Sequence, residues 1–102
     1  MSVIVVATAF PAAEHRDEVI TAFETAVKRV HNEPGVELYA LHEGDDRLVM
    51  IEKYSSDQAR VEHNKGAALA DLAAVLRDKL TRGLDVQVLR PHPAGDDTKG
   101  AI

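Results

Sequence analysis

The segment that most constrains the fold is the Asn-Glu-Pro-Gly turn at 32–35, together with the two apolar stretches that follow it. Proline cannot continue a helix, and Pro-Gly suits the two central positions of a type II turn. Val36–His42 and Leu48–Tyr54 both have the composition of strands, and the acidic loop Glu43–Arg47 separates them. The pattern predicts a helix that ends before the turn, followed by a two-stranded hairpin.

Hydrophobic periodicity indicates the elements on either side of this hairpin. Val3–Phe10 is a β-branched apolar run that Pro11 ends, so it is predicted to be a strand. Between Glu14 and Val30 apolar residues recur at helical spacing, with acidic residues first and basic residues last, as the helix dipole favours. Ser55 and Gln58 have capping-box spacing and predict the start of a second helical region.

The second helical region is interrupted. Asn-Lys-Gly at 64–66 predicts a break, after which leucines continue on one face as far as Leu80. Gly83 is a suitable helix stop, and Leu84–Leu89 alternates as a fourth strand would. We therefore expect one domain over residues 1–91 and a flexible tail over 92–102, which is rich in Pro, Gly and Asp.

The predicted order β-α-β-β-α-β is that of a ferredoxin-like α+β sandwich, with both helical regions on one face of an antiparallel sheet. A sheet face that meets water should be polar. Here Leu48 and Met50 alternate with Val49 and Ile51, so both faces of the sheet are apolar. The simplest cover for the second face is the same face of another copy, which predicts a homodimer.

Composition removes several classes of function. The chain has 102 residues, a formal net charge of -5 and no cysteine. Its acidic balance, without a basic cluster, argues against nucleic acid and anionic membranes as partners. No apolar run approaches the ~20 residues of a membrane span, and Met1-Ser2 leads directly into a strand without a signal peptide. We expect a cytoplasmic location.

The five histidines do not have metal-binding spacing, and no metal site is predicted. His15, His31 and His92 are expected in solvent. His42 lies either in a cavity or at the exposed end of its hairpin. His63 falls at the break in the second helical region, where it either overhangs a cavity or caps the helix end.

Glu52 is the most informative carboxylate, because its position in the strand pattern places it on an apolar face with Met50 and Tyr54. An ionised carboxylate there needs a partner or nearby water. It forms either a salt bridge across a dimer or an acid/base group whose pKa is raised by burial. Tyr39 and Tyr54 either pack in the core or bind substrate through their hydroxyls.

Taken together, Glu-Pro-Gly at 33–35, the apolar run 48–51 closing in Glu-Lys-Tyr at 52–54, Ser-Ser at 55–56 and His63 give a pattern that resembles the antibiotic biosynthesis monooxygenase (ABM) domain. The resemblance covers about residues 3–90. It implies a dimeric α+β barrel, and an enzyme that oxidises a quinol or another small aromatic or enolisable substrate with molecular oxygen and no cofactor.

By matching position, the resemblance implies catalytic roles for Glu52 and His63 and a substrate-binding role for Tyr54. Tyr39, His42 and Met50 are the further predicted substrate contacts. The family often has Trp where this chain has Tyr54, and the absence of Trp argues against haem chemistry. Two alternatives stay open: a small ligand-binding or stress-associated barrel without turnover, and a small-molecule isomerase of the same superfamily.

Overall fold

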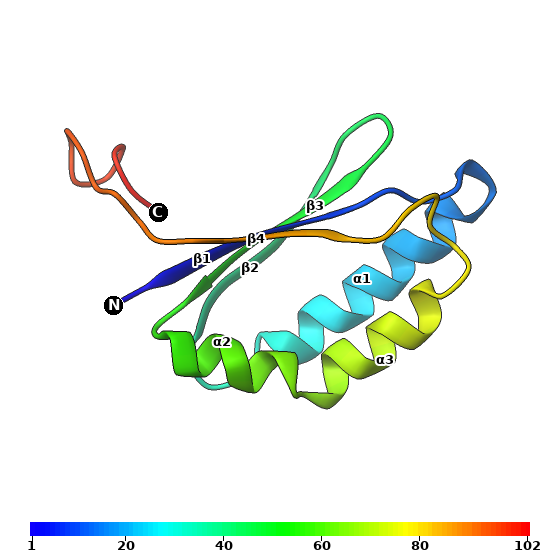
Figure 1. The fold of residues 1–102 in the computed structure, drawn as a ribbon, viewed down its shortest axis with the longest axis horizontal. Coiled ribbons are helices and arrows are strands. Elements are labelled where there is room, and N and C mark those ends of the chain that lie inside the picture. The colour runs from blue at the N-terminus through cyan, green and yellow to red at the C-terminus, as the bar shows by residue number, and fades with distance from the viewer.

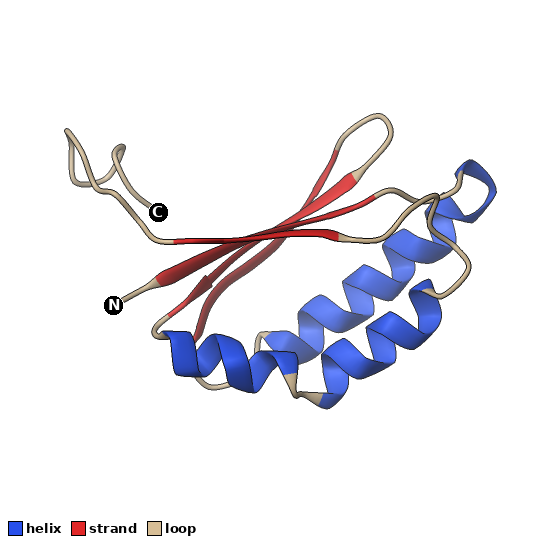
Figure 2. Cartoon of the chain, viewed as in Figure 1, coloured by secondary structure: helices blue, strands red, loops and turns tan.

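A computed structural model describes residues 1–102, and the predicted order of strands and helices is confirmed (Figures 1 and 2). A short 3₁₀ helix, η1, precedes the first α-helix. The elements are β1 (Val3–Ala9), η1 (Ala13–His15), α1 (Arg16–Val30), β2 (Val36–Glu43), β3 (Leu48–Tyr54), α2 (Asp57–Asn64), α3 (Ala67–Leu76) and β4 (Asp85–Leu89).

The four strands form one antiparallel sheet in the order β2-β3-β1-β4. This order and the helices packed on one side make the molecule an α+β, ferredoxin-like sandwich, as predicted. The pairing register places Glu52 of β3 between Val5 of β1 and Tyr39 of β2, in the middle of the sheet. Because facing residues of paired strands point to the same side, these three side chains share the helix-covered face.

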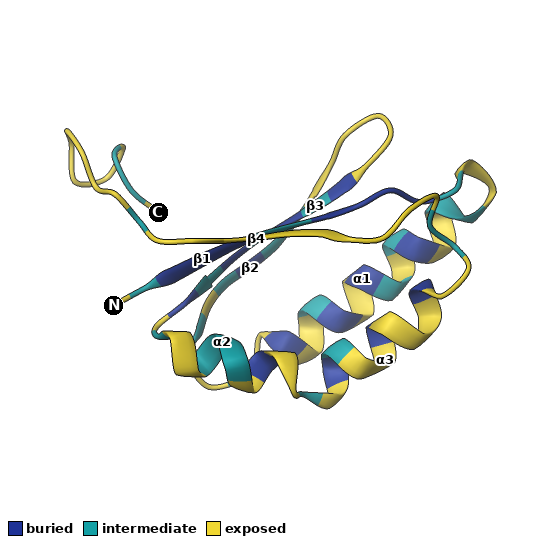
Figure 3. Cartoon of the chain, in the orientation of Figure 1, coloured by how far each residue is buried: buried dark blue, intermediate teal, exposed yellow.

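The main core lies between the helices and this face of the sheet (Figure 3). From α1 it takes a stripe at helical spacing, and from the sheet it takes side chains that alternate along the strands. Complete burial of a large apolar side chain stabilises a fold by about 1.5–3 kcal/mol, so this layer dominates the stability. Its buried members are Ala9, Val19, Phe23, Ala26, Val30, Tyr39, Leu48, Met50, Ala68, Leu72 and Leu76.

The opposite face of the sheet carries no helix (Figure 2). Val6 faces Ile51 and Thr8 faces Val49 across β1 and β3 on this side. The edge strand β4 is exposed along its whole length (Figure 3), and its Leu89, which pairs with Ile4 and is 44% exposed, lies on this uncovered side. A single chain therefore leaves apolar side chains of the sheet uncovered, as the strand pattern predicts.

Two sequence expectations about helix ends are wrong. Ser56, not Ser55, is the N-cap of α2, and its hydroxyl accepts a hydrogen bond from the backbone N–H of Ala59. Helix α3 ends at Leu76 rather than near Leu80, because Asp78 takes a positive φ of 67°.

The segment after α3 then pairs with the chain that leaves β1. Leu80 forms an isolated bridge with Pro11, and the Thr81 N–H donates to the carbonyl of Phe10. This pairing replaces the last helical turn that the leucine spacing had predicted.

Residues 92–102 contain no helix or strand and extend beyond β4 (Figure 1). Their flexibility stays a prediction. None of the helices combines the length and the apolar character that crossing a membrane requires.

Candidate functional site

Glu52 occupies the centre of the helix-covered face and is only 5% exposed. The hydroxyl of Tyr54, two residues along the same strand face, donates a hydrogen bond of 2.5 Å to Glu52 Oε1. Burial raises the pKa of Glu52, and the Tyr54 hydrogen bond and nearby His63 oppose that rise. Burial and the adjacent carboxylate also raise the pKa of Tyr54, so its hydroxyl remains a donor.

His63 reaches the same region from α2. The N-cap Ser56 starts this helix, and the side chain at its last turn points inward, where it is 4% exposed. Its ring lies beside the rings of Tyr39 and Tyr54, with centroid distances of 5.3 and 5.5 Å. On one edge, His63 Nδ1 lies 2.8 Å from Oε1 of Glu33.

Tyr39, Met50, Glu52 and His63 line one mainly apolar cavity of about 130 Å³. It lies between the sheet and the helices and extends towards β4. The full lining is Val5, Ala7, Phe23, Tyr39, Met50, Glu52, Arg60, His63, Asn64, Leu69, Leu72, Leu84, Val86 and Val88.

Three polar atoms of this lining make no hydrogen bond within the chain: the Tyr39 hydroxyl, Glu52 Oε2 and His63 Nε2. No fully buried side-chain polar atom lacks a partner, so each of the three has accessible surface. Burial and the Glu52 charge raise the pKa of Tyr39, which keeps its hydroxyl protonated. The residues that line the cavity therefore include a hydroxyl donor, a carboxylate oxygen and an imidazole nitrogen that have no partner within the chain.

Two of the predicted site residues lie outside this cavity. His42 faces Val49 on the opposite side of the sheet, is exposed, and its ring Nδ1 lies 3.1 Å from the carbonyl oxygen of Ala40. Tyr54 is fully buried behind the cavity, where its hydroxyl contacts Glu52 rather than the open space. His31 is exposed as predicted, yet its Nε2 lies 3.0 Å from the Tyr39 carbonyl oxygen.

Sequence reasoning missed three polar residues of this region: Glu33, Arg60 and Asn64. Arg60 and Asn64 line the cavity with His63, since residues three and four apart share a helix face. That spacing could have identified them once the start of α2 was known. Nothing in the local sequence connects Glu33 with His63, because 30 positions separate them.

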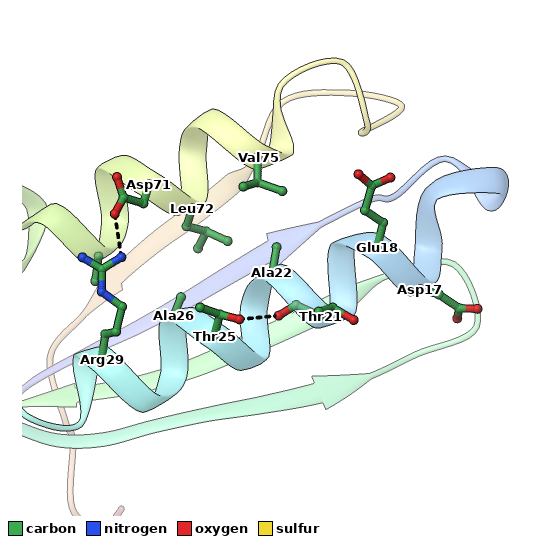
Figure 4. Close-up of a pocket in the computed structure, with 11 residues that line it drawn as sticks. Asp17, Glu18, Thr21, Ala22, Thr25, Ala26, Arg29, Asp71, Leu72 and Val75 are labelled. Carbon is green, nitrogen blue, oxygen red and sulfur yellow. Dashed lines mark hydrogen bonds and ion pairs between the residues drawn. The ribbon is translucent and has the colours of Figure 1, made fainter.

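A second hollow, of about 520 Å³, lies between α1 and α3 on the outside of the helix layer (Figure 4). Its floor is apolar, and Arg29 and Asp71 form an exposed ion pair of 2.6 Å at its rim. Glu18 pairs there with Lys79 at 3.6 Å. Arg29–Asp71 and Glu18–Lys79 are thus surface ion pairs, whereas Glu52 and His63 are buried.

The geometry defines a small α+β sandwich with a buried carboxylate, imidazole and phenol around one cavity. The sequence model of the family described as antibiotic biosynthesis monooxygenase matches residues 2–75, well over half of the chain. The chain belongs to this family. No functionally curated protein matches it.

Solved structures agree on the fold. The chain is similar to Rv0793 from Mycobacterium tuberculosis, with 26% identity, a TM-score of 0.88, and coverage of 94% of this chain and 100% of that one. A crystal structure of an antibiotic biosynthesis monooxygenase has 20% identity and a TM-score of 0.83, covering 89% and 99%. PA3566 from Pseudomonas aeruginosa has 20% identity and a TM-score of 0.79, covering 86% and 91%.

Proposed function

We propose that this protein is a monooxygenase that needs no cofactor and that oxidises a quinol or another small aromatic or enolisable substrate with molecular oxygen. The observation that carries the proposal is one mainly apolar cavity lined by Tyr39, Glu52 and His63, whose hydroxyl, Oε2 and Nε2 have no hydrogen-bond partner within the chain. Family membership supports a monooxygenase in general terms. The substrate class and the residue roles are our inference.

In the proposed reaction, Glu52 or His63 takes a proton from a substrate hydroxyl or enolisable carbon. The Tyr39 hydroxyl donates a hydrogen bond to the resulting oxyanion, and the apolar lining around Met50 holds the ring. The electron-rich anion then reduces oxygen. One oxygen atom is inserted into the substrate, which loses two hydrogens overall, and the other oxygen atom leaves as water.

Removing the proton is the step that this site is built to assist, because an anion transfers an electron to oxygen far more readily than the neutral phenol does. A positioned acid or base typically contributes about 10²–10⁴-fold in rate. A dry cavity adds to this effect by strengthening each hydrogen bond inside it.

The test is oxygen uptake with a panel of hydroquinones and anthrones. We expect His63→Ala and Glu52→Gln to lower turnover about 10²–10⁴-fold. Asp71→Asn, which alters an exposed acid in the outer α1–α3 hollow, should leave turnover unchanged. Full activity in both site variants would refute the proposed roles.

If the wild-type protein consumes no oxygen with any member of the panel, the alternatives of a ligand-binding barrel or an isomerase would apply. Both would use the same cavity without oxygen. The proposal also includes a homodimer, because a single chain leaves one apolar sheet face uncovered. A cytoplasmic location stays a prediction from the sequence.

A further inference from the structure

The contact between Glu33 and His63 has not been used in the reaction described above, although it fixes one edge of the His63 ring. Nδ1 of His63 and Oε1 of Glu33 are 2.8 Å apart, and the two side chains are 3% and 23% exposed. We propose that Glu33 is a positioning residue that sets the tautomer of His63 and thereby makes Nε2 the base of the site. This inference rests on the proposed function.

The chemistry of the contact sets the position of the proton. An ionised carboxylate only accepts hydrogen bonds, so the proton shared by Glu33 and His63 is on Nδ1. In the neutral imidazole Nε2 then carries the lone pair. Nε2 makes no hydrogen bond within the chain, so it is available to accept a proton from a ligand in the cavity.

The turn that carries Glu33 explains how a residue 30 positions away reaches this ring. The Val36 N–H bonds the Glu33 carbonyl oxygen at 3.4 Å, and Gly35 has a φ of 82°, as a type II turn requires. The Gly35 carbonyl accepts the Ser55 N–H at 2.8 Å, which ties the turn to the segment before α2.

Helix α2 packs so closely on this turn that only glycine fits there. A Cβ atom on Gly35 would lie 2.5 Å from Cβ of Ala59. The close approach places Glu33 beside the last turn of α2, where His63 lies. The Glu-Pro-Gly turn therefore belongs to the site. Gly35 allows α2 to lie close to the turn, and Glu33 contacts His63.

Two tyrosine rings, tilted by 60° and 39° to the imidazole, also pack beside it and restrict its movement. Tyr39 and Tyr54 pack against it at centroid distances of 5.3 and 5.5 Å. A flip of the ring about its Cβ–Cγ bond would put a ring carbon in the place of Nδ1. The 2.8 Å contact between Nδ1 and Glu33 would then be lost. The arrangement resembles the general pattern of a base oriented by a third group.

The direct test is the tautomer of His63, read from the ¹⁵N shifts of the neutral imidazole by NMR. We expect the Nδ1–H form in the wild-type protein and in Glu33→Asp, which keeps a carboxylate. Glu33→Gln can donate as well as accept, so it should give a mixture that contains the Nε2–H form. Glu62→Gln, on the same helix and exposed, is the matched control and should keep the Nδ1–H form.

The kinetic test uses the same variants with a substrate from the oxygen-uptake panel. We expect Glu33→Gln to lower kcat about 10- to 100-fold with little change in KM, the range found when a carboxylate behind a metal-ligating histidine is removed. Glu33→Asp should recover part of the loss. Glu62→Gln should retain wild-type kcat.

The tautomer measurement and the kinetic measurement test the positioning role of Glu33 separately from the proposed function. An Nε2–H tautomer in the wild-type protein, or ¹⁵N shifts that Glu33→Gln leaves unchanged, would overturn the inference whether or not the protein is active. If the tautomer changes and kcat of an active protein does not, the positioning role is also overturned. A wild-type protein that shows the expected tautomer but no oxygen uptake would refute the proposed function alone. If Glu33→Gln does not fold, the tautomer of Glu33→Asp and of the wild type decides the inference.

Discussion

The Glu52 carboxylate lies in an apolar layer and keeps one hydrogen bond, from Tyr54. Burial favours its neutral form, so the folded state binds this proton more readily than the unfolded chain does. The stability that Glu52 contributes is therefore complete below the ordinary glutamate pKa of 4.5 and is lost as the pH rises through the raised value.

This linkage gives a residue-scale prediction. Glu52→Gln removes the titration, so the free energy of unfolding of the wild-type protein should fall relative to that of the variant as the pH increases from 4.5. Urea unfolding at a series of pH values measures the difference. A difference that stays flat or grows with pH would contradict the burial effect.

Tyr54→Phe provides a second check on the same carboxylate. It removes the hydrogen bond that holds down the pKa of Glu52, so the decline in stability should extend to higher pH than in the wild-type protein. It should also lower stability by about 1.5–3 kcal/mol at neutral pH, the typical value of a hydrogen bond to a charged group.

At the scale of elements, the contact between the 32–35 turn and α2 is the feature on which the site depends. Gly35→Ala adds a Cβ atom 2.5 Å from Ala59 at a backbone φ of 82°. The left-handed conformation costs a non-glycine residue about 1–2 kcal/mol, and overpacking adds about 1–3 kcal/mol. We expect a loss of stability of about 2–5 kcal/mol in urea unfolding.

Gly83→Ala is the control for this prediction, since no atom lies within 4 Å of the added Cβ and the φ is not positive. It should be neutral or slightly stabilising, because alanine restricts the unfolded chain. Equal effects of the two substitutions would show that α2 does not depend on the turn.

At the scale of the whole molecule, the uncovered sheet face predicts association. Ile51 lies on that face opposite Val6, and Leu89 of β4, which pairs with Ile4, adds a further exposed apolar residue. A stable dimer through this face should bury more than about 1,200 Å² in total. We expect sedimentation to give a dimer at micromolar concentration, and Ile51→Asp to convert it to monomer or to unfold it.

Val75→Asp is the matched control for association, because Val75 is 40% exposed on the outer side of α3 and far from this face of the sheet. It should leave the dimer intact. A wild-type protein that sediments as a monomer would contradict the homodimer.

Most of the architecture could be predicted from the sequence, for reasons that are local. Alternation along Leu48–Tyr54, helical spacing over Arg16–Val30 and the Pro-Gly turn each report on backbone geometry within a few residues. The placement of Glu52 on an apolar face of the sheet followed from the same alternation. The end of α3 did not, since pairing of Leu80 with Pro11 overrides a helical pattern.

What the sequence by itself determined is therefore the set of elements, their order and the apolar character of both sheet faces, because periodicity and turn chemistry act at short range. Tertiary structure alone decided which side chains meet. A register shift in β2 between Val36 and Leu38 reverses the faces that follow it, which sends His42 to the outer side and Tyr39 into the cavity. The contact of Glu33 with His63 depends on how closely α2 packs on a distant turn, and no pattern within either segment contains that distance.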